Sequence, residues 1–379
     1  MSRSKTVSFA APAHARSVIS RMRIAIALLA VVAMALAGSA SAGASQKKAP
    51  KNPAGPHAQG LVMPLSMDLL NGGTRALVSQ AGIGTASIVS SNGSVRDVFA
   101  EEGLNAVAAG PFGTVLYTAN SGGDGPEGPS GPLVSQLKIR FPGGQTHVLA
   151  DLGTYEQTKN PDGVNTYGIT DLDQDCAAQW PTDQFGPPSF TGGINSNPFK
   201  LAVSLFGVYV VDSGANAILF VDWMGRISTV AVLPPQPTVI TDPSNLGLPD
   251  CVAGHTYNFE AVPTDMEFSW LSAIVSLLPG GPEGPELGAR GSVVRLNLWN
   301  GKTTPVAGGF LGATDLAVSP TGTIYVTELF GDRVTKVTKH GNQTVAELPM
   351  PAAIQWAGNG RLVVAYNVFA SGEIATIKG

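Results

Sequence analysis

Four polar residues, each near the start of a short apolar segment, are the first candidates for chemistry in this chain. They are Asn105, Asn197, Asp265 and Asp315. Carboxylate and amide oxygens are hard ligands that suit Ca²⁺ or another divalent cation such as Mg²⁺. A fold that brought the four together would therefore create a cation site. The alternative is that they satisfy backbone groups at strand ends or bind water, because Asn and Asp are also ordinary turn residues.

A second set of candidates lies in two long polar segments. His255 and Glu260 could act as an acid/base pair, or His255 could simply be an exposed loop residue. Asp171, Asp173 and Asp175 alternate like the ligands of a calcium loop, but the Gly and distant Glu of an EF-hand are missing. We interpret them as a solvated acidic loop. The sequence contains no serine-hydrolase, zinc-protease, P-loop or dinucleotide motif.

The elements that must position these residues are short strands in a repeated pattern. Asn197–Leu233 holds four runs rich in Val, Ile, Phe and Tyr, separated by turn residues. Four-strand units spaced by roughly 40–50 residues are typical of a β-propeller. We therefore predict an all-β, six-bladed β-propeller with four-stranded antiparallel blades. The six units are Leu61–Phe99, Leu104–Leu152, Asn197–Leu233, Val262–Val306, Gly312–Leu348 and Pro351–Lys378.

The last unit lacks a fourth strand, so we expect an N-terminal strand at Leu61–Val62 to pair with it and close the ring. Propellers bind ligands around the axis, where the first strand of each blade begins. The four candidate cation ligands are expected there. Propeller lactonases and lyases, which are distantly similar, hold a divalent cation on such a ring.

Two insertions, at residues 153–195 and 234–260, interrupt the repeat. Strand direction places both on the same face as the loops Asn120–Pro132 and Leu278–Gly291. We predict that this long-loop face binds a small molecule or a protein ligand. Aromatic residues of the first insertion either line a ligand or pack the insertion onto the propeller. They are Tyr155, Tyr167, Trp180 and Phe185.

Each insertion also carries one of the two cysteines, Cys176 and Cys251. Because both insertions are expected on one face, we predict a disulfide between them. It would close a loop of about 75 residues, which the chain-entropy model values at roughly 4 kcal/mol. The alternative is two free thiols in surface loops.

The N-terminus predicts export. Residues 1–42 combine basic residues, an apolar run and an A-x-A cleavage site, which is typical of a secretory signal peptide starting at Met1 or Met22. Its removal takes the formal net charge from −4 to −9, because five of the 23 basic and none of the 27 acidic residues lie there. We expect a secreted or periplasmic protein with a flexible linker at residues 43–60, no membrane span after cleavage, and neither nucleic acid nor an anionic membrane as a partner. The alternative is a retained membrane anchor.

Four stretches resemble the ScyD/ScyE family, secreted bacterial propeller proteins named for the gene cluster that makes the sunscreen pigment scytonemin. They are Asp151–Gly163, Ser196–Val203, Val208–Pro234 and Glu260–Met266. The resemblance runs from about the second blade to the C-terminus. It implies an NHL-like six-bladed propeller outside the cytoplasm, and it transfers no catalytic residue.

These observations lead to two hypotheses. The first is an extracytoplasmic β-propeller of the ScyD/ScyE type that acts as a ligand- or protein-binding or scaffold module. The second is a divalent-metal-dependent enzyme of the lactonase or lyase kind with its site on the propeller axis. The sequence leaves open whether the protein is an enzyme.

Overall fold

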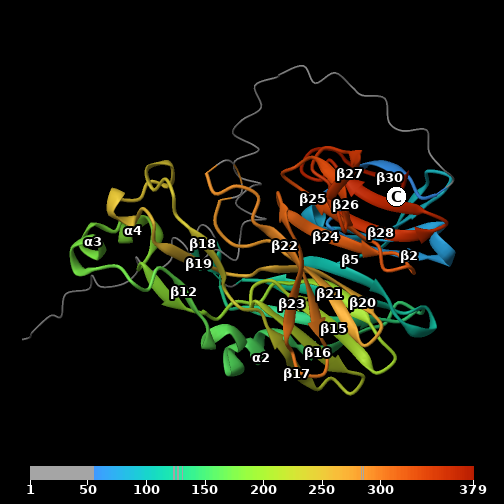
Figure 1. Ribbon diagram of the computed structural model, residues 1–379. Coiled ribbons are helices and arrows are strands. Elements are labelled where there is room, and N and C mark those ends of the chain that lie inside the picture. The colour runs from blue at the N-terminus through green and yellow to red at the C-terminus, as the bar shows by residue number, and fades with distance from the viewer. Residues whose placement is uncertain (1–54, 123, 126–127, 130, 283, 285) are drawn as a thin grey trace, which may run out of the picture.

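The computed structural model describes residues 55–379 except 123, 126, 127, 130, 283 and 285. The predicted signal peptide, the start residues Met1 and Met22, and the predicted linker up to residue 54 lie outside this range. Within the described part, the regular structure is dominated by seven four-stranded antiparallel sheets (Figure 1). No described helix is long and apolar enough to cross a membrane.

Six sheets follow one another along the chain. The first three comprise β2 (Ser66–Leu70), β3 (Arg75–Gln80), β4 (Thr85–Ser90) and β5 (Val95–Ala100); β6 (Leu104–Ala109), β7 (Val115–Ser121), β10 (Val134–Arg140) and β11 (Thr146–Asp151); and β14 (Pro198–Val203), β15 (Gly207–Asp212), β16 (Ala217–Asp222) and β17 (Ile227–Val232). The next three comprise β20 (Pro263–Ser269), β21 (Ser272–Leu277), β22 (Gly291–Asn297) and β23 (Thr303–Phe310); β24 (Ala313–Val318), β25 (Ile324–Glu328), β26 (Arg333–Thr338) and β27 (Gly341–Glu347); and β28 (Ala353–Gly358), β29 (Arg361–Tyr366) and β30 (Gly372–Lys378) with β1 (Ala58–Leu61).

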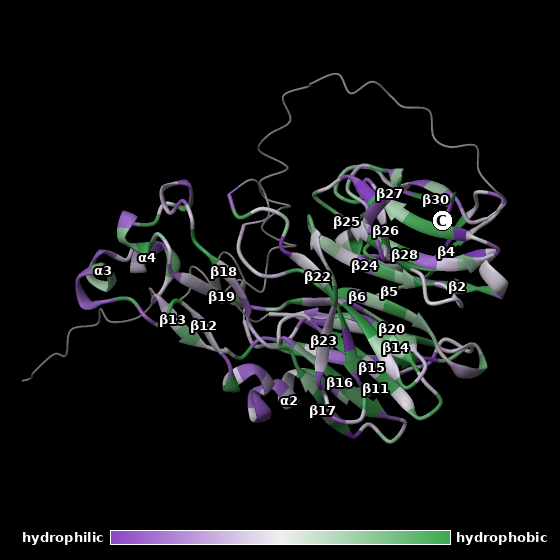
Figure 2. Ribbon diagram, in the orientation of Figure 1, coloured by the Kyte–Doolittle hydropathy of each residue, from purple (hydrophilic) through white to green (hydrophobic). Residues whose placement is uncertain are grey.

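The first strands of these sheets contact one another in the order β2, β6, β14, β20, β24 and β28, and β28 contacts β2. Neighbouring sheets pack face to face: Leu116 and Leu137 lie in one apolar cluster with Val210 and Leu219 of the next sheet. Figure 2 shows hydrophobic residues along the strands of the stacked sheets. Each sheet is apolar on both faces and needs a neighbour on each side. The chain is therefore a β-propeller, as its repeats predicted.

The N-terminal strand starts earlier than expected. β1 pairs with β30 through Ala58↔Ile374 and Leu61↔Gly372. Thr376 Oγ1 also donates a hydrogen bond of 3.3 Å to the Pro56 carbonyl. The prediction that residues 43–60 are all linker is therefore wrong for the segment from Gly55 onward, because that segment already packs on the last sheet.

The seventh sheet was not predicted. It comprises β12 (Thr166–Gly168), β13 (Ser189–Thr191), β18 (Gln236–Val239) and β19 (Thr256–Phe259). β12 and β13 come from the first insertion and β18 and β19 from the second, and the two halves join through Gly168↔Asn258. With α3 (Gln174–Gln179), α4 (Thr182–Phe185), η5 (Ser244–Leu246) and η6 (Asp250–Val252), this sheet forms what we call the insertion lobe, which projects from the propeller in Figure 1.

The remaining elements are short. α2 (Leu152–Lys159) packs on β10, and β8 (Asp124–Gly125) pairs with β9 (Gly128–Pro129) in the loop after β7. The other 3₁₀ turns are η1 (Asn71–Gly73), η2 (Ala81–Ile83), η3 (Pro111–Gly113) and η4 (Pro161–Val164).

Candidate functional site

Charged and polar residues meet at the axis because they share one position in the first strands. The third residue of each such strand is Asp68 in β2, Ala106 in β6, Lys200 in β14, Asp265 in β20, Asp315 in β24 and Gln355 in β28. Most of them, together with Glu267, line an axial cavity of about 250 Å³. A common register in six contacting strands thus creates one polar site.

Lys200 forms a buried ion pair with Asp315. Burial acts to lower the pKa of Lys200, but the charges of Asp315 and Asp265 outweigh it and raise that pKa, so the amine stays protonated. The backbone N–H of Leu316 donates to Asp315 at 2.7 Å and to Asp265 at 3.2 Å, which holds the two carboxyl groups side by side. Burial and then repulsion from Asp265 raise the pKa of Asp315.

The cavity also holds Glu267, a carboxyl with a raised pKa. Gln355 Nε2 donates to Glu267 Oε1 at 3.1 Å. Burial, reinforced by the charge of Asp265, raises the pKa of Glu267 to about 8. Asp68 accepts a hydrogen bond of 2.8 Å from the Ala109 N–H, and burial raises its pKa too. Near neutral pH, Glu267 can therefore donate a hydrogen bond.

The axial cavity can bind hydroxyl and ammonium groups and can exchange protons, because its carboxyl groups outnumber its single cation. Lys200 is poorly suited to act as a nucleophile, since its amine is protonated. Among the described residues, no group of three or more His, Cys, Asp or Glu side chains is arranged to hold a metal ion.

The four predicted cation ligands do not converge as one set. Asn105 Nδ2 donates to Asn197 Oδ1 at 2.9 Å, so the two amides bind each other. Asp265 and Asp315 instead share the surroundings of Lys200. Asn105 is the second residue of β6, and Asn197 is the residue just before β14. Neither therefore occupies the third strand position that the acids share.

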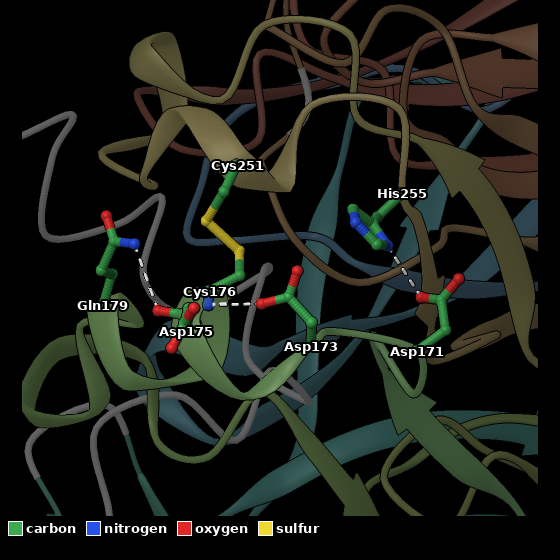
Figure 3. The surroundings of a disulfide bond; sticks show 7 residues. All are labelled: Asp171, Asp173, Asp175, Cys176, Gln179, Cys251 and His255. Atoms are coloured by element: carbon green, nitrogen blue, oxygen red, sulfur yellow. Dashed lines mark hydrogen bonds and ion pairs between the residues drawn. A yellow bond between two sulfur atoms is a disulfide. The ribbon is translucent and has the colours of Figure 1, made fainter.

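The proposed acid/base pair is engaged elsewhere. His255 Nδ1 lies 3.0 Å from Asp171 Oδ1 in the insertion lobe (Figure 3). Glu260 is buried, and its Oε1 accepts a hydrogen bond of 3.3 Å from Asn216 Nδ2. The acidic residues Asp171, Asp173 and Asp175 are solvent-exposed as predicted, and Asp173 also caps α3 by accepting from the Cys176 N–H at 2.8 Å.

The four stretches that resemble ScyD/ScyE proteins meet at the base of the insertion lobe. Asn216 Nδ2 donates to Asp162 at 2.8 Å as well as to Glu260. Ser196 Oγ donates to Asp212 at 2.6 Å, which also accepts from the Asn197 N–H. The resemblance therefore maps onto one buried polar junction, which is distinct from the axial cavity.

Carboxyl groups in this junction are unusually basic. Burial raises the pKa of Glu156 to about 8, and the charge of Asp212 adds to the effect. Burial also raises the pKa of Asp162 to about 6, although hydrogen bonds from Asn216 and Tyr167 act against it. Glu156 Oε2 and Asp162 Oδ1 are buried without a hydrogen-bond partner in the described part of the chain. The junction therefore favours protonated acids.

The insertion lobe is cross-linked as predicted. Cys176 and Cys251 form a disulfide with a Cα–Cα distance of 5.8 Å, which joins α3 to η6 (Figure 3). Around it lies an apolar core of Ile169, Trp180, Ile240, Val252, Tyr257 and Phe259. Neither insertion could bury these side chains alone.

A second cavity, of about 360 Å³, opens beside this core. Both insertions and the loop Leu278–Gly291 contribute to its wall, which confirms that these segments share a face. Most of the lining is apolar or aromatic: Trp180, Phe185, Ile240, Leu246, Leu248, Tyr257, Phe259 and Leu287, with Asn245 and Glu286 as polar members. We call it the lobe pocket.

The loop is fixed against the lobe by Arg290. Its guanidinium lies 4.4 Å from the centre of the Phe259 ring and donates to the carbonyls of Gly280 and Pro282. A Cβ on Gly281 would come 2.5 Å from the Phe259 ring, so glycine is required for this close approach.

Of the aromatic candidates, Trp180 and Phe185 line the lobe pocket. Tyr167 is buried and donates to Asp162 at 3.1 Å, and Tyr155 hydrogen-bonds Thr229. Sequence reasoning missed Lys200, Glu267 and the lobe pocket. Aligning the repeats by column would have found Lys200, because it occupies the position held by Asp in three other repeats.

No protein-family model matches the sequence, and no curated protein matches it. Solved structures do match this chain. A streptogramin B lyase is 12% identical, with 85% of this chain and 97% of that chain covered and a TM-score of 0.46. A glucose dehydrogenase is 12% identical, with 87% and 100% covered and a TM-score of 0.49. PQQ-bound aldose sugar dehydrogenase from Streptomyces coelicolor is 16% identical, with 86% and 100% covered and a TM-score of 0.44.

Proposed function

We propose that this chain is an extracytoplasmic β-propeller of the ScyD/ScyE type that binds a small, largely apolar ligand in the lobe pocket. The proposal rests on the lobe pocket. Its volume of about 360 Å³ and apolar lining fit the usual dimensions and chemistry of a small-molecule site. The few polar groups, Asn245 and Glu286, would orient the ligand.

We infer six blades, with β1 as the strand that closes the ring. The closed order of contacts among the six first strands supports this count. The pairing of β1 with β30 supports closure. The insertion lobe is then an addition to the long-loop face rather than a seventh blade.

Export is part of the proposal. The disulfide between Cys176 and Cys251 supports it, because such bonds persist in oxidising compartments. Cross-linking also serves binding, since it joins the two insertions that both contribute to the pocket wall. A preformed pocket loses less conformational entropy when the ligand binds.

The neutral fluorescent probe N-phenyl-1-naphthylamine tests the pocket. Wild-type protein should enhance its fluorescence saturably with one site per chain. Leu246→Gln, which places an amide in the pocket wall, should weaken binding at least tenfold. Val239→Gln is the matched control, because Val239 is exposed on the strand just before Ile240. Absence of saturable binding by wild type, or equal loss in both variants, would refute the pocket.

A further inference from the structure

Large apolar side chains are concentrated on the face opposite the insertion lobe. Eight of them among the described residues have exposed fractions between 78% and 99%. Val164 belongs to the first insertion. The other seven all lie in hairpin turns of three adjacent sheets: Phe112, Leu205, Phe206, Met224, Trp270, Leu271 and Trp299. We call these seven residues the tip surface.

Topology places the tip surface on one face. Its turns connect first to second strands, as β6–β7, β14–β15 and β20–β21 do, or third to fourth strands, as β16–β17 and β22–β23 do. In an antiparallel four-strand sheet these turns emerge together, opposite the connections that carry the insertions. The three sheets are neighbours, because β14 contacts both β6 and β20.

Two of these turns also pack against the outer strand of the preceding sheet. A Cβ on Gly225, next to Met224, would lie 2.4 Å from the Leu149 carbonyl of the preceding sheet. A Cβ on Gly301, two residues after Trp299, would lie 2.5 Å from the Val230 carbonyl of the preceding sheet. The turns of the three sheets are therefore held next to their neighbouring sheets by close backbone packing.

The charge of this region differs from that of the whole chain. Asp222, the last residue of β16, accepts a hydrogen bond of 2.6 Å from Arg226 in the turn that follows. Lys302 adds a second cation at the end of the Trp299 turn. The five turns thus contain two cations and no acidic residue; with Asp222 counted their formal charge is +1, whereas that of the chain is −4. The corresponding turns of the other three sheets are residues 71–74, 91–94, 319–323, 339–340 and 358–360. None of these turns contains a large apolar residue.

We propose that the tip surface binds the interfacial region of a phospholipid membrane. A rigid protein partner would need a separate pocket for each nearly free-standing side chain, whereas a fluid interface accommodates all of them. Tryptophan favours that region because its ring is apolar and its N–H is polar. Arg226 and Lys302 can reach headgroup phosphates while the apolar tips enter the acyl boundary. The lobe pocket then faces away from the membrane.

Flotation with vesicles of equimolar phosphatidylcholine and phosphatidylglycerol tests the proposal. Wild type should float with the vesicles, and the triple variant Trp270→Ser/Leu271→Ser/Trp299→Ser should bind at least tenfold more weakly. Ile83→Ser/Val164→Ser removes exposed apolar residues outside the tip surface and should bind as wild type does. All forms share the same N-terminal residues, so that segment cannot explain a difference.

Two further measurements complete the test. Tryptophan emission of wild type should shift to shorter wavelength on adding vesicles, and the shift should be lost in the triple variant. Equal thermal unfolding of the variant and wild type would confirm that the exposed substitutions leave the fold intact. Failure of wild type to float, or equal loss in the control variant, would overturn the proposal. A wild-type dimer that the triple variant converts to monomer, without flotation, would identify the tip surface as a protein interface instead.

Discussion

Lys200 and Asp315 form a buried ion pair across the propeller axis although they are separated by 115 residues in the chain. They belong to different sheets, and each stands third in the first strand of its sheet. Lys200 is the one cation in a site with four carboxyl groups, those of Asp68, Asp265, Glu267 and Asp315. The stability of the axial site should therefore depend on it.

Replacing Lys200 should test this dependence. Lys200→Met leaves the buried acids without a cation, and loss of one partner of a buried pair typically costs about 3–5 kcal/mol of unfolding free energy. The loss should be larger at pH 8 than at pH 5, where the acids can be protonated instead. Urea unfolding measures it, with the exposed Lys339→Met as the control. A loss no larger than that of the control at both pH values would contradict a structural role for the pair.

Stability should also depend on pH through the junction acids. The pKa of Glu156 is raised to about 8 and that of Asp162 to about 6 in the folded protein. The folded state therefore binds more protons than the unfolded state above about pH 4.5, and stability must fall as pH rises from there to about 8. We expect a lower Tm at pH 8.5 than at pH 5.5, by at least about 2 °C.

Glu156→Gln should reduce that pH dependence, because the amide cannot ionise. Glu102→Gln is the control, since Glu102 is exposed. Thermal unfolding followed by circular dichroism at both pH values gives the comparison. An undiminished Tm difference in Glu156→Gln would show that another group is responsible.

Removing the disulfide should loosen the insertion lobe. Cys176→Ala/Cys251→Ala frees a loop with a sequence separation of 75, and the chain-entropy model predicts a loss of about 4 kcal/mol. Binding of N-phenyl-1-naphthylamine should weaken in parallel, because both insertions line the lobe pocket. Intact mass of the non-reduced wild type after alkylation checks the bond itself. Addition of two alkyl groups without reductant would mean that the bond does not form.

Truncation should locate the start of the folded chain. Deletion of residues 1–54 should leave thermal stability nearly unchanged, whereas deletion of residues 1–61 removes β1 and exposes an edge of β30. The longer deletion should unfold at a temperature several degrees lower and aggregate more readily. Identical melting curves for the two proteins would show that β1 contributes nothing to closure.

Added calcium should not stabilise the protein through the axial site. Lys200 already pairs with Asp315, and among the described residues no three acidic side chains are arranged to hold a metal ion. We expect an unchanged Tm in excess CaCl₂, and the same result for Asn197→Ala and Asp265→Ala relative to their own calcium-free values. A calcium-dependent rise in Tm that Asp265→Ala removes would restore the metal-dependent hypothesis.

Much of the architecture could be predicted from local sequence. Alternating apolar residues and turn residues mark each strand, and their recurrence identifies the four-stranded sheets. The disulfide between Cys176 and Cys251 could also be predicted, because strand direction puts the two insertions that carry them on one face. These features depend on short-range patterns and on the antiparallel geometry that a meander imposes.

Contacts between distant segments could not be predicted in this way. β12 pairs with β19 only because both insertions leave the same face of the propeller. Neither insertion has an alternating apolar pattern long enough to predict a strand. The axial cavity depends on register: Lys200 meets Asp315 because equivalent strand positions converge on one axis, while Asn105 and Asn197, displaced along their strands, bind each other. Sequence thus determined which residues could do chemistry, and three-dimensional packing decided which of them meet. The reason is that successive side chains of a strand point to opposite faces, so a displacement of one residue moves a side chain to the other face.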